Sequence, residues 1–155
     1  MSDAALKPQT RDIVVEEVFP HSAETIWRVL TTGELVARWL KMPMAGFAPT
    51  PGTRFTFQTT PAGAWDGVIH CQVLDVEPNV RLSYAWRGGD EGNTGYGSKL
   101  DTVVTWTLTP TDGGTRLTLV HSGFVTPKND SAYKAMSGGW RGVVQTIGDL
   151  AATQH

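Results

Sequence analysis

The chain has 155 residues, with 13 Lys and Arg against 15 Asp and Glu, so its formal net charge is −2 and it offers no basic surface for nucleic acid or anionic lipid. Its single cysteine, Cys71, excludes an internal disulfide and a cysteine-rich zinc site. No apolar run approaches the ~20 residues that cross a bilayer, and no secretion signal stands at the N-terminus, so we expect a cytoplasmic protein that does not insert into membranes.

The N-terminal residues predict a flexible tail followed by one domain. Residues 1–10 are polar and contain Pro8, which is typical of a loose terminus. The remaining length suits one domain with a full hydrophobic core, so we expect a single domain over residues 11–152. Its first strand is expected over residues 11–19, where valines recur until Pro20 ends the strand.

Two short helices are expected directly after this strand. Ser22 can cap a helix over residues 23–30, whose apolar side chains then turn inward. A second short helix is expected over residues 34–40. Beyond it the chain must form a loop, because prolines follow one another closely at Pro43, Pro49 and Pro51.

The middle of the chain predicts an antiparallel meander of strands joined by short turns such as Asp112-Gly113-Gly114. Alternating apolar and polar residues place these strands at 53–59, 67–76, 80–86, 102–109 and 116–122. The same alternation directs a large set of apolar side chains, with one histidine, to one face of each strand: Phe55, Phe57, Leu82, Tyr84, Trp86, Val104, Trp106, Leu108, Leu117, Leu119 and His121.

The strand at 67–76 has apolar residues on both faces, so its inward face is ambiguous. One parity holds Val68, Leu74 and Val76, and the other holds Ile69, Cys71 and Val73. Either both faces are covered or a β-bulge shifts the register within the strand.

The C-terminal residues predict a long amphipathic helix, because apolar residues recur at steps of three and four. Such a helix after a series of strands must lay its apolar stripe on the sheet. We therefore expect an α+β fold in which a curved antiparallel sheet wraps around a long C-terminal helix. Glycines beside Trp140, at positions 138, 139, 142 and 148, leave room for a cavity between helix and sheet. The stripe consists of Tyr133, Met136, Trp140, Val143, Ile147 and Leu150.

This helix–sheet cavity is the best lead to function. Large aromatic side chains fill cores, but they also line ligand pockets, and the two roles are compatible. The glycine-rich residues 88–98 predict a flexible loop, on which Tyr96 could act as a lid over the cavity. We expect the ligand to contact Phe55, Phe57, Tyr84, Trp86, Trp106, His121, Met136 and Trp140.

Two titratable side chains have alternative roles. His121 is either a core histidine bonded to a buried partner, which is the commoner case, or a ligand contact. Glu17 shares a strand face with the apolar Val15 and Phe19. It is therefore either a water-exposed residue at a strand edge or a polar residue of the pocket wall with a raised pKa.

No pattern for a metal, a cofactor or a nucleophile is present. The four histidines are scattered, and there is no G-x-S-x-G motif. The glycine-rich residues 92–99 fail the phosphate-loop pattern, because Ser98 precedes Lys99 and a strand follows. We predict no bound metal, no cofactor and no catalytic set.

Several separated segments, in this order, resemble one family: "IWRVLTTGELVARWL" (residues 26–40), "PGTRFTF" (51–57), "VLDVEPNVRLSYAW" (73–86), "TWTLTPTDGGTRLTLVHSGF" (105–124) and "GGWRGVVQTIGDLA" (138–151). Over roughly residues 11–152 the chain is similar to the activator of heat-shock protein 90 ATPase-like branch of the START-like, or helix-grip, superfamily. The resemblance implies a helix-grip fold whose cavity accepts apolar or amphipathic molecules, and it carries over no catalytic residues.

The leading hypothesis is a carrier or sensor that binds a small hydrophobic or amphipathic ligand, without catalysis. One alternative is an enzyme of the polyketide cyclase or aromatase kind, in which Glu17 or His121 would transfer protons. The other is a co-chaperone-like interaction module, which would expose an apolar patch; the named co-chaperone has an additional N-terminal region, which counts against a chaperone partner here. The patch would consist of Leu40, Met42, Met44 and Phe47, a segment that equally suits a pocket gate or the surface of a homodimer.

Overall fold

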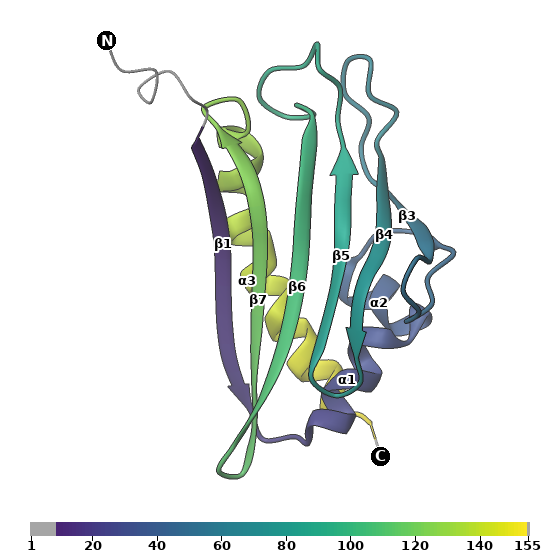
Figure 1. Cartoon of the computed structure of the whole chain (residues 1–155), viewed down its shortest axis with the longest axis vertical. Helices are drawn as coiled ribbons and strands as arrows, with labels where there is room; N and C mark the ends of the chain where they lie inside the picture. Colours follow the sequence, from purple (N-terminus) through teal and green to yellow (C-terminus); the bar gives the residue numbers. More distant parts are fainter. Residues whose placement is uncertain (1–8, 155) are drawn as a thin grey trace.

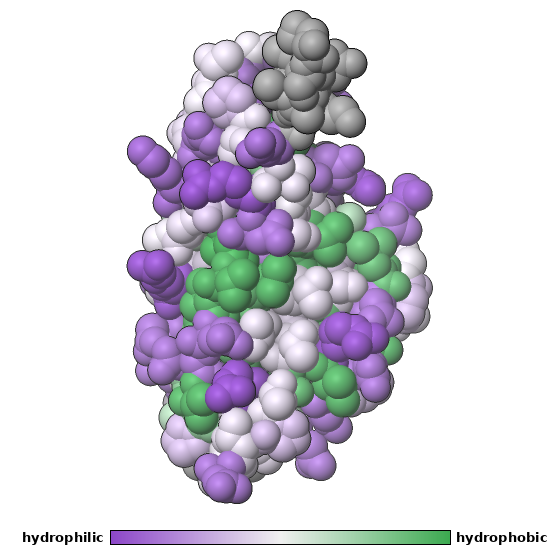
Figure 2. Space-filling view, turned by 60° about the vertical axis from the view of Figure 1, so that its left-hand side comes forward, coloured by the Kyte–Doolittle hydropathy of each residue, from purple (hydrophilic) through white to green (hydrophobic). Residues whose placement is uncertain are grey.

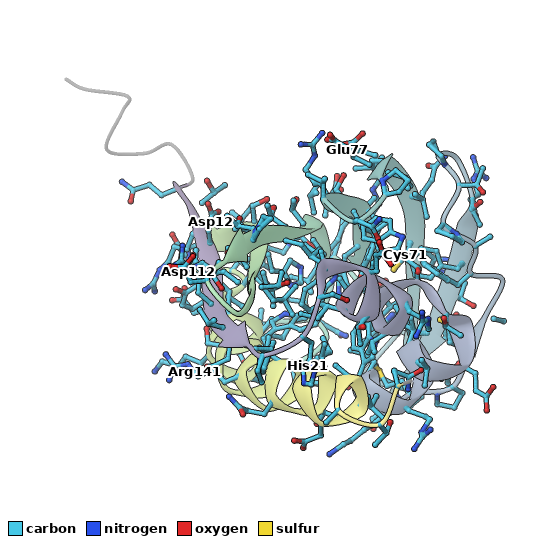
Figure 3. All side chains as sticks on the ribbon, turned by 90° about the horizontal axis from the view of Figure 1, so that it is seen from below. Asp12, His21, Cys71, Glu77, Asp112 and Arg141 are labelled. Carbon is cyan, nitrogen blue, oxygen red and sulfur yellow. The ribbon has the colours of Figure 1, made fainter. Side chains whose placement is uncertain are left out.

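A seven-stranded antiparallel sheet, in the order β1-β7-β6-β5-β4-β3-β2, curves around a long C-terminal helix (Figure 1). The computed structural model describes residues 9–154. Seen along the strands, the sheet arches over α3, and side chains fill the space between them (Figure 3). This is the predicted α+β fold. The elements are β1 (Gln9–Phe19), α1 (Ala23–Thr31), α2 (Gly33–Leu40), β2 (Met44–Ala45), β3 (Arg54–Gln58), β4 (Val68–Glu77), β5 (Arg81–Gly88), β6 (Leu100–Thr111), β7 (Gly114–Thr126) and α3 (Asp130–Ala151).

The first strand begins earlier than its sequence predicted. Gln9 and Thr10 continue the ladder that β1 forms with β7, opposite Thr126 and Val125. The predicted boundary of the tail is therefore wrong by two residues, because β7 extends far enough to pair with them. The rest of the predicted tail, residues 1–8, lies outside the described residues.

Both predicted short helices are present and have the expected start and stop signals. The Ser22 side chain caps α1 by accepting a hydrogen bond from the backbone N–H of Thr25 at 3.2 Å. Thr32 ends α1 and begins α2, so the two helices follow one another without a linker. Lys41 then ends α2 in the left-handed conformation, with φ 61°.

A bulge resolves the ambiguous strand β4. Ile69, Cys71 and Val73 face inward and are buried, whereas Leu74 is 48% exposed. The register with β5 shifts between Val73 and Asp75, so the strand changes parity there and Val76 packs on the core. Of the two alternatives, the bulge is correct.

The remaining strands follow their alternation. The inward set of β5, β6 and β7 is buried as expected, and Asp112 and Gly113 form the turn between Thr111 and Gly114. The loop after α2 also contains the two-residue strand β2, which pairs with Phe57 and Thr56 of β3. The sequence missed β2 because its prolines indicate only a loop.

Candidate functional site

An aromatic plug fills the middle of the space between helix and sheet. The indole of Trp140 lies 5.7 Å from that of Trp106 and 5.6 Å from that of Trp86, measured between ring centroids, and Trp39 packs on Trp106 at 5.5 Å. All four rings are buried. We call Trp39, Trp86, Trp106 and Trp140 the aromatic plug; it divides the helix–sheet space into a filled part and an open part.

Hydrogen bonds hold the plug in one arrangement. The indole N–H of Trp140 donates to Nδ1 of His121 at 2.9 Å. Because an indole N–H can only donate, Nδ1 must be unprotonated and the ring proton sits on Nε2. Nε2–H then donates to Oγ1 of Thr102 at 2.7 Å, and the Thr102 hydroxyl donates to the backbone carbonyl of Trp86 at 2.8 Å. This series of hydrogen bonds connects α3, β7, β6 and β5.

His121 is therefore a core histidine. It is fully buried, and this burial lowers its pKa from 6.5 to about 3, so the ring is neutral near pH 7. Both ring nitrogens are engaged by Trp140 and Thr102. A second proton on Nδ1 would face the donor of Trp140, so the ring is held as a neutral acceptor and donor and is not free to transfer protons.

Glu17 lies on the surface, so of its two alternatives the water-exposed residue at a strand edge is correct and the pocket-wall residue is not. Its carboxylate accepts a hydrogen bond from Gln145 of α3 at 3.4 Å and is exposed. It lines a shallow outer hollow between β1 and α3 together with Arg141, which Figure 3 shows on the outside of the helix. Glu17 shares its strand face with Val15 and Phe19 but is not covered, because β1 is the edge strand and the polar face of α3 lies beside it.

The open part of the helix–sheet space is an apolar cavity of about 190 Å³. It lies beyond the plug, toward the end of the molecule that is uppermost in Figure 1, where α3 begins. Its walls come from the loop after α2, from strands β4 to β6, from the β3–β4 and β5–β6 loops, and from the first turns of α3. The apolar walls are Met42, Trp65, Ile69, Trp86, Tyr96, Leu100, Ala132, Ala135 and Met136.

An apolar groove of about 230 Å³ continues from the cavity along the side of α3. The cavity and the groove share four wall residues, so they meet along a common boundary. The shared residues are Met42, Trp86, Ala135 and Met136, and the groove alone adds Leu40, Gly139, Trp140 and Val143.

Two loops close the outer end of the cavity and are bonded to each other. The hydroxyl of Tyr96 donates to the carbonyl of Thr60 at 2.6 Å, and its ring lies 5.9 Å from that of Trp65. The Asn93 side chain donates to the carbonyl of Ala62 at 2.8 Å. Gly97 has φ +85°, and a Cβ there would lie 3.1 Å from Cβ of Ala62 on the facing loop, so a larger residue would push the loops apart.

Asn129 anchors the base of the glycine-rich loop to the start of α3. Its buried side-chain amide donates to Oγ of Ser98 at 3.0 Å and to the carbonyl of Lys99 at 2.9 Å. Its amide oxygen accepts the backbone N–H of Val125 at 2.9 Å. The loop carrying Tyr96 is thus fixed at its base and bonded at its tip.

The structure brings only some of the predicted contact residues to the open space. Tyr96, Trp86 and Met136 line the cavity, and Trp140 lines the groove. The other five predicted contacts do not line either space and pack within the core: Phe55, Phe57, Tyr84, Trp106 and His121.

Sequence reasoning missed the walls contributed by loops and by small residues of α3. Trp65 lies in the loop between β3 and β4, outside any periodic pattern. Ala132 and Ala135 are small residues beside Met136. Their spacing of three and four residues up to Gly139 is the sequence signal that small residues line this face of α3. The apolar patch expected at Leu40, Met42, Met44 and Phe47 is half-buried, because these side chains pack on the core. Leu40 and Met42 form part of the groove wall.

Other chemistry has little support among the described residues. Burial raises the pKa of the Cys71 thiol, which disfavours the reactive thiolate. Within residues 9–154 no group of His, Cys, Asp and Glu side chains is placed to share a metal ion. In the same part of the chain, every helix is too short or too polar to cross a bilayer.

Apolar side chains are also exposed at the outer edge of the sheet. Val14 and Val18 of β1 are 58% and 50% exposed, and no strand pairs with the free side of β1 among the described residues. Figure 2, which brings the side of β1 forward, shows apolar surface there with hydrophilic side chains around it.

A sheet that grips a C-terminal helix and leaves an apolar cavity between them defines the START-like, or helix-grip, class of protein. Within this class, the model of the Activator of Hsp90 ATPase homolog 1-like protein family matches residues 20–152, and the chain belongs to that family. The resemblance found in the sequence is thereby confirmed. No curated protein matches the chain.

Solved structures with this fold span nearly the whole chain. Protein MLL2253 from Mesorhizobium loti is 37% identical, with a TM-score of 0.78, over 94% of this chain and 99% of that one. CalU16 from Micromonospora echinospora is 20% identical, with a TM-score of 0.67, over 95% and 86%. Aha1 from Colwellia psychrerythraea, solved as a dimer, is 16% identical, with a TM-score of 0.67, over 90% and 94%. The last two show the fold alone.

Proposed function

We propose that this protein is a carrier or sensor that binds a small apolar ligand in the cavity between α3 and the sheet, without catalysing a reaction. The observation that supports it most is the cavity of about 190 Å³ with almost entirely apolar walls. An engineered apolar cavity of about 150 Å³ stays dry and binds benzene. A space of this size and lining therefore suits an apolar guest better than water.

Hydrophobic burial can supply the affinity that such a carrier needs. Burial contributes about 0.8 kcal/mol per CH₂ group, so six buried methylenes contribute about 5 kcal/mol before the cost of immobilising the ligand. The aromatic walls Trp65 and Trp86 add flat contact area.

The alternative of a cyclase-like enzyme lacks its proton-transferring pair. Glu17 lies in an outer surface hollow, and both nitrogens of His121 are used within the core. A co-chaperone-like surface around Met42 lacks exposure, since that segment packs on the core. Ligand binding is therefore the reading with most support.

Tyr96 serves as the lid of this site in the proposal. It lines the cavity and is bonded across to the facing loop at Thr60. Glycines at positions 95 and 97, both with positive φ, flank Tyr96 and give the loop conformations that other residues rarely adopt. When this lid opens, the tip of the loop would separate from Thr60, while the hydrogen bonds of Asn129 would hold the base of the loop in place.

Ligand titration of tryptophan fluorescence tests the proposal, because Trp65 and Trp86 line the cavity. The variant Ala135→Phe fills the boundary between cavity and groove, and Lys134→Phe adds the same ring one position away on the exposed face of α3. We expect saturable binding of medium-chain ketones and alcohols. Affinity should fall at least about tenfold in Ala135→Phe, a loss of about 1.4 kcal/mol or more, and stay unchanged in Lys134→Phe.

Absence of saturable binding, or equal losses in the two variants, contradicts the proposal. Circular dichroism of both variants checks that the fold persists. A homodimer is a separate proposal, supported by the exposed edge strand β1 with Val14 and Val18. Sedimentation at several protein concentrations tests it, and a monomer at every concentration contradicts it.

A further inference from the structure

The indole N–H of Trp86 has no hydrogen-bond partner among residues 9–154, although the side chain as a whole is nearly buried. The other three indoles of the plug donate: Trp39 to the carbonyl of Val29 at 3.0 Å, Trp106 to the hydroxyl of Tyr84 at 3.0 Å, and Trp140 to His121. Trp86 is 2% exposed, and its Nε1 is not one of the fully shielded, unpartnered side-chain atoms of residues 9–154, so this atom still reaches open space.

This donor belongs to the boundary between the cavity and the groove, since Trp86 lines both. A donor that loses contact with water and gains no other acceptor costs about 1–3 kcal/mol. A ligand that fills this boundary displaces water from the N–H, and it avoids that cost only if it brings an acceptor. The walls around the donor are apolar, so a single acceptor among hydrocarbon fits them best.

Gly139 lines the groove beside this boundary, and internal packing does not require a glycine there. A glycine within a helix costs about 1 kcal/mol relative to alanine. A Cβ on Gly139 would meet no atom within 4 Å, so no neighbour in the described chain explains the choice. Because Gly139 has no side chain, the groove is deeper at this position, and an extended hydrocarbon chain of a ligand can lie directly on the helix backbone.

We infer that the ligand is an elongated apolar molecule that carries one oxygen acceptor between two hydrocarbon parts. One part fills the cavity, the oxygen accepts the hydrogen bond from Nε1–H of Trp86, and the other part lies in the groove over Gly139. This inference rests on the proposed function and specifies the class of its ligand.

A pair of isosteric probes tests the hydrogen bond. The ketone 6-undecanone and the alkene 2-pentyl-1-heptene each carry two pentyl chains, and they differ in that a C=CH₂ group replaces the C=O group. We expect the wild-type protein to bind the ketone about fivefold to tenfold more tightly. In Trp86→Phe, which removes the N–H and keeps an aromatic ring, this preference should disappear. A preference that survives the substitution overturns the role of Trp86.

Indole NMR of the wild-type protein gives a second readout that does not depend on the folding of the variant. Saturation with the ketone should move the Trp86 Nε1–H proton downfield, and saturation with the alkene should leave it near its free position. Equal responses to both probes would contradict the hydrogen bond.

Two matched glycine variants test the elongated shape. Gly138 and Gly139 are exposed neighbours on α3, and a Cβ on either meets no atom within 4 Å, but only Gly139 lines the groove. Gly139→Leu should weaken 6-undecanone about tenfold or more, since burial of two to three methylenes is lost, and leave 2-heptanone unchanged, because a methyl group replaces the second pentyl chain in that ketone. Gly138→Leu should affect neither ketone. Equal behaviour of the two variants would overturn the placement in the groove.

These outcomes separate the inference from the proposed function. If neither ketone nor alkene binds, the proposed function fails. If both bind in the cavity with equal affinity, the cavity is a ligand site and only the acceptor is wrong. If Gly139→Leu changes the oligomeric state and not ligand binding, the groove is a surface between two copies of the chain.

Discussion

The two ends of the helix–sheet space have similar aromatic walls and opposite packing. Toward the end where α1 and α2 pack on α3, Trp39 and Trp106 meet large aliphatic residues and the space is filled. Toward the start of α3, Trp65 and Trp86 face Ala132, Ala135 and Met136, and a cavity remains. We call these the closed end and the open end.

The comparison shows that aromatic content does not distinguish a core from a pocket. Hydrogen bonding does not either, since Trp65 at the open end donates inside the chain just as Trp39 and Trp106 do at the closed end. The size of the facing side chains does: α3 carries Val144 and Ile147 at the closed end, and alanines at the open end. Large partners therefore mark the core.

The largest expected contrast comes from truncating one residue in each region. Trp106→Ala should lower the free energy of unfolding by about 3–5 kcal/mol, because it opens a cavity in a filled core. Met136→Ala should cost less than about 2 kcal/mol, since Met136 already borders open space on two sides. Urea denaturation measures both, and similar losses would remove the distinction between the two ends.

Acid should destabilise the protein through His121. The pKa of His121 is about 3 in the folded protein and 6.5 in the unfolded chain. Below pH 6.5 the unfolded chain therefore binds a proton that the folded protein does not bind. The stability from this residue is complete above pH 6.5 and declines as the pH falls toward 3. We expect a loss of about 2 kcal/mol between pH 8 and pH 5, at about 1.4 kcal/mol per pH unit once below 6.5.

His121→Gln is the control for this pH dependence. Its amide oxygen can accept from Trp140 and its amide nitrogen can donate to Thr102, but it does not titrate. Stability measured by urea denaturation across the same pH range should lose most of its slope in this variant. A slope equal to that of the wild type would show that other groups cause the acid sensitivity.

Thr102 tests the bonding of the plug more locally. Thr102→Val keeps the shape but leaves Nε2–H of His121 and the carbonyl of Trp86 without their partner, which should cost about 1–3 kcal/mol. Thr102→Ser keeps the hydroxyl and should cost less. Thermal denaturation of both variants checks this order, and an equal cost would mean that the methyl group matters more than the hydrogen bonds.

The smallest expected effect concerns the lid. Tyr96→Phe removes the hydrogen bond to Thr60, an exposed contact worth about 0.5–1 kcal/mol. We expect ligand dissociation to quicken about twofold to fivefold in stopped-flow fluorescence, with the free energy of unfolding nearly unchanged. An unchanged dissociation rate would show that ligands leave by another route, such as the groove.

The architecture could be predicted because period and parity report which way a side chain points. Alternation placed Tyr84, Trp106 and His121 on the inner face, and the stripe of α3 found its partner in the sheet. Local signals such as the cap at Ser22 set the helix starts. The bulge at Leu74 left no signal beyond a conflict of parity, so the sequence could state it only as an alternative.

The extent of the cavity could not be predicted, because it depends on how far side chains from separate elements reach. Phe57 and Trp106 point inward as expected, yet neighbouring rings meet them and no space remains. The glycines of α3 were expected to leave room, but they differ in their surroundings. A Cβ on Gly148 would collide with Phe19, so that glycine permits close packing, whereas Gly139 opens onto the groove.

Methionine methyl NMR tests the central claim most directly, because three methionines sample the relevant surroundings. Met42 and Met136 line the cavity and the groove, and Met44 packs beside Gly33 outside both. With ¹³C-methyl methionine and added 6-undecanone, the ε-methyl signals of Met42 and Met136 should shift in a saturable way while that of Met44 stays in place. Unmoved signals of Met42 and Met136 at a ligand concentration that saturates binding would contradict the account.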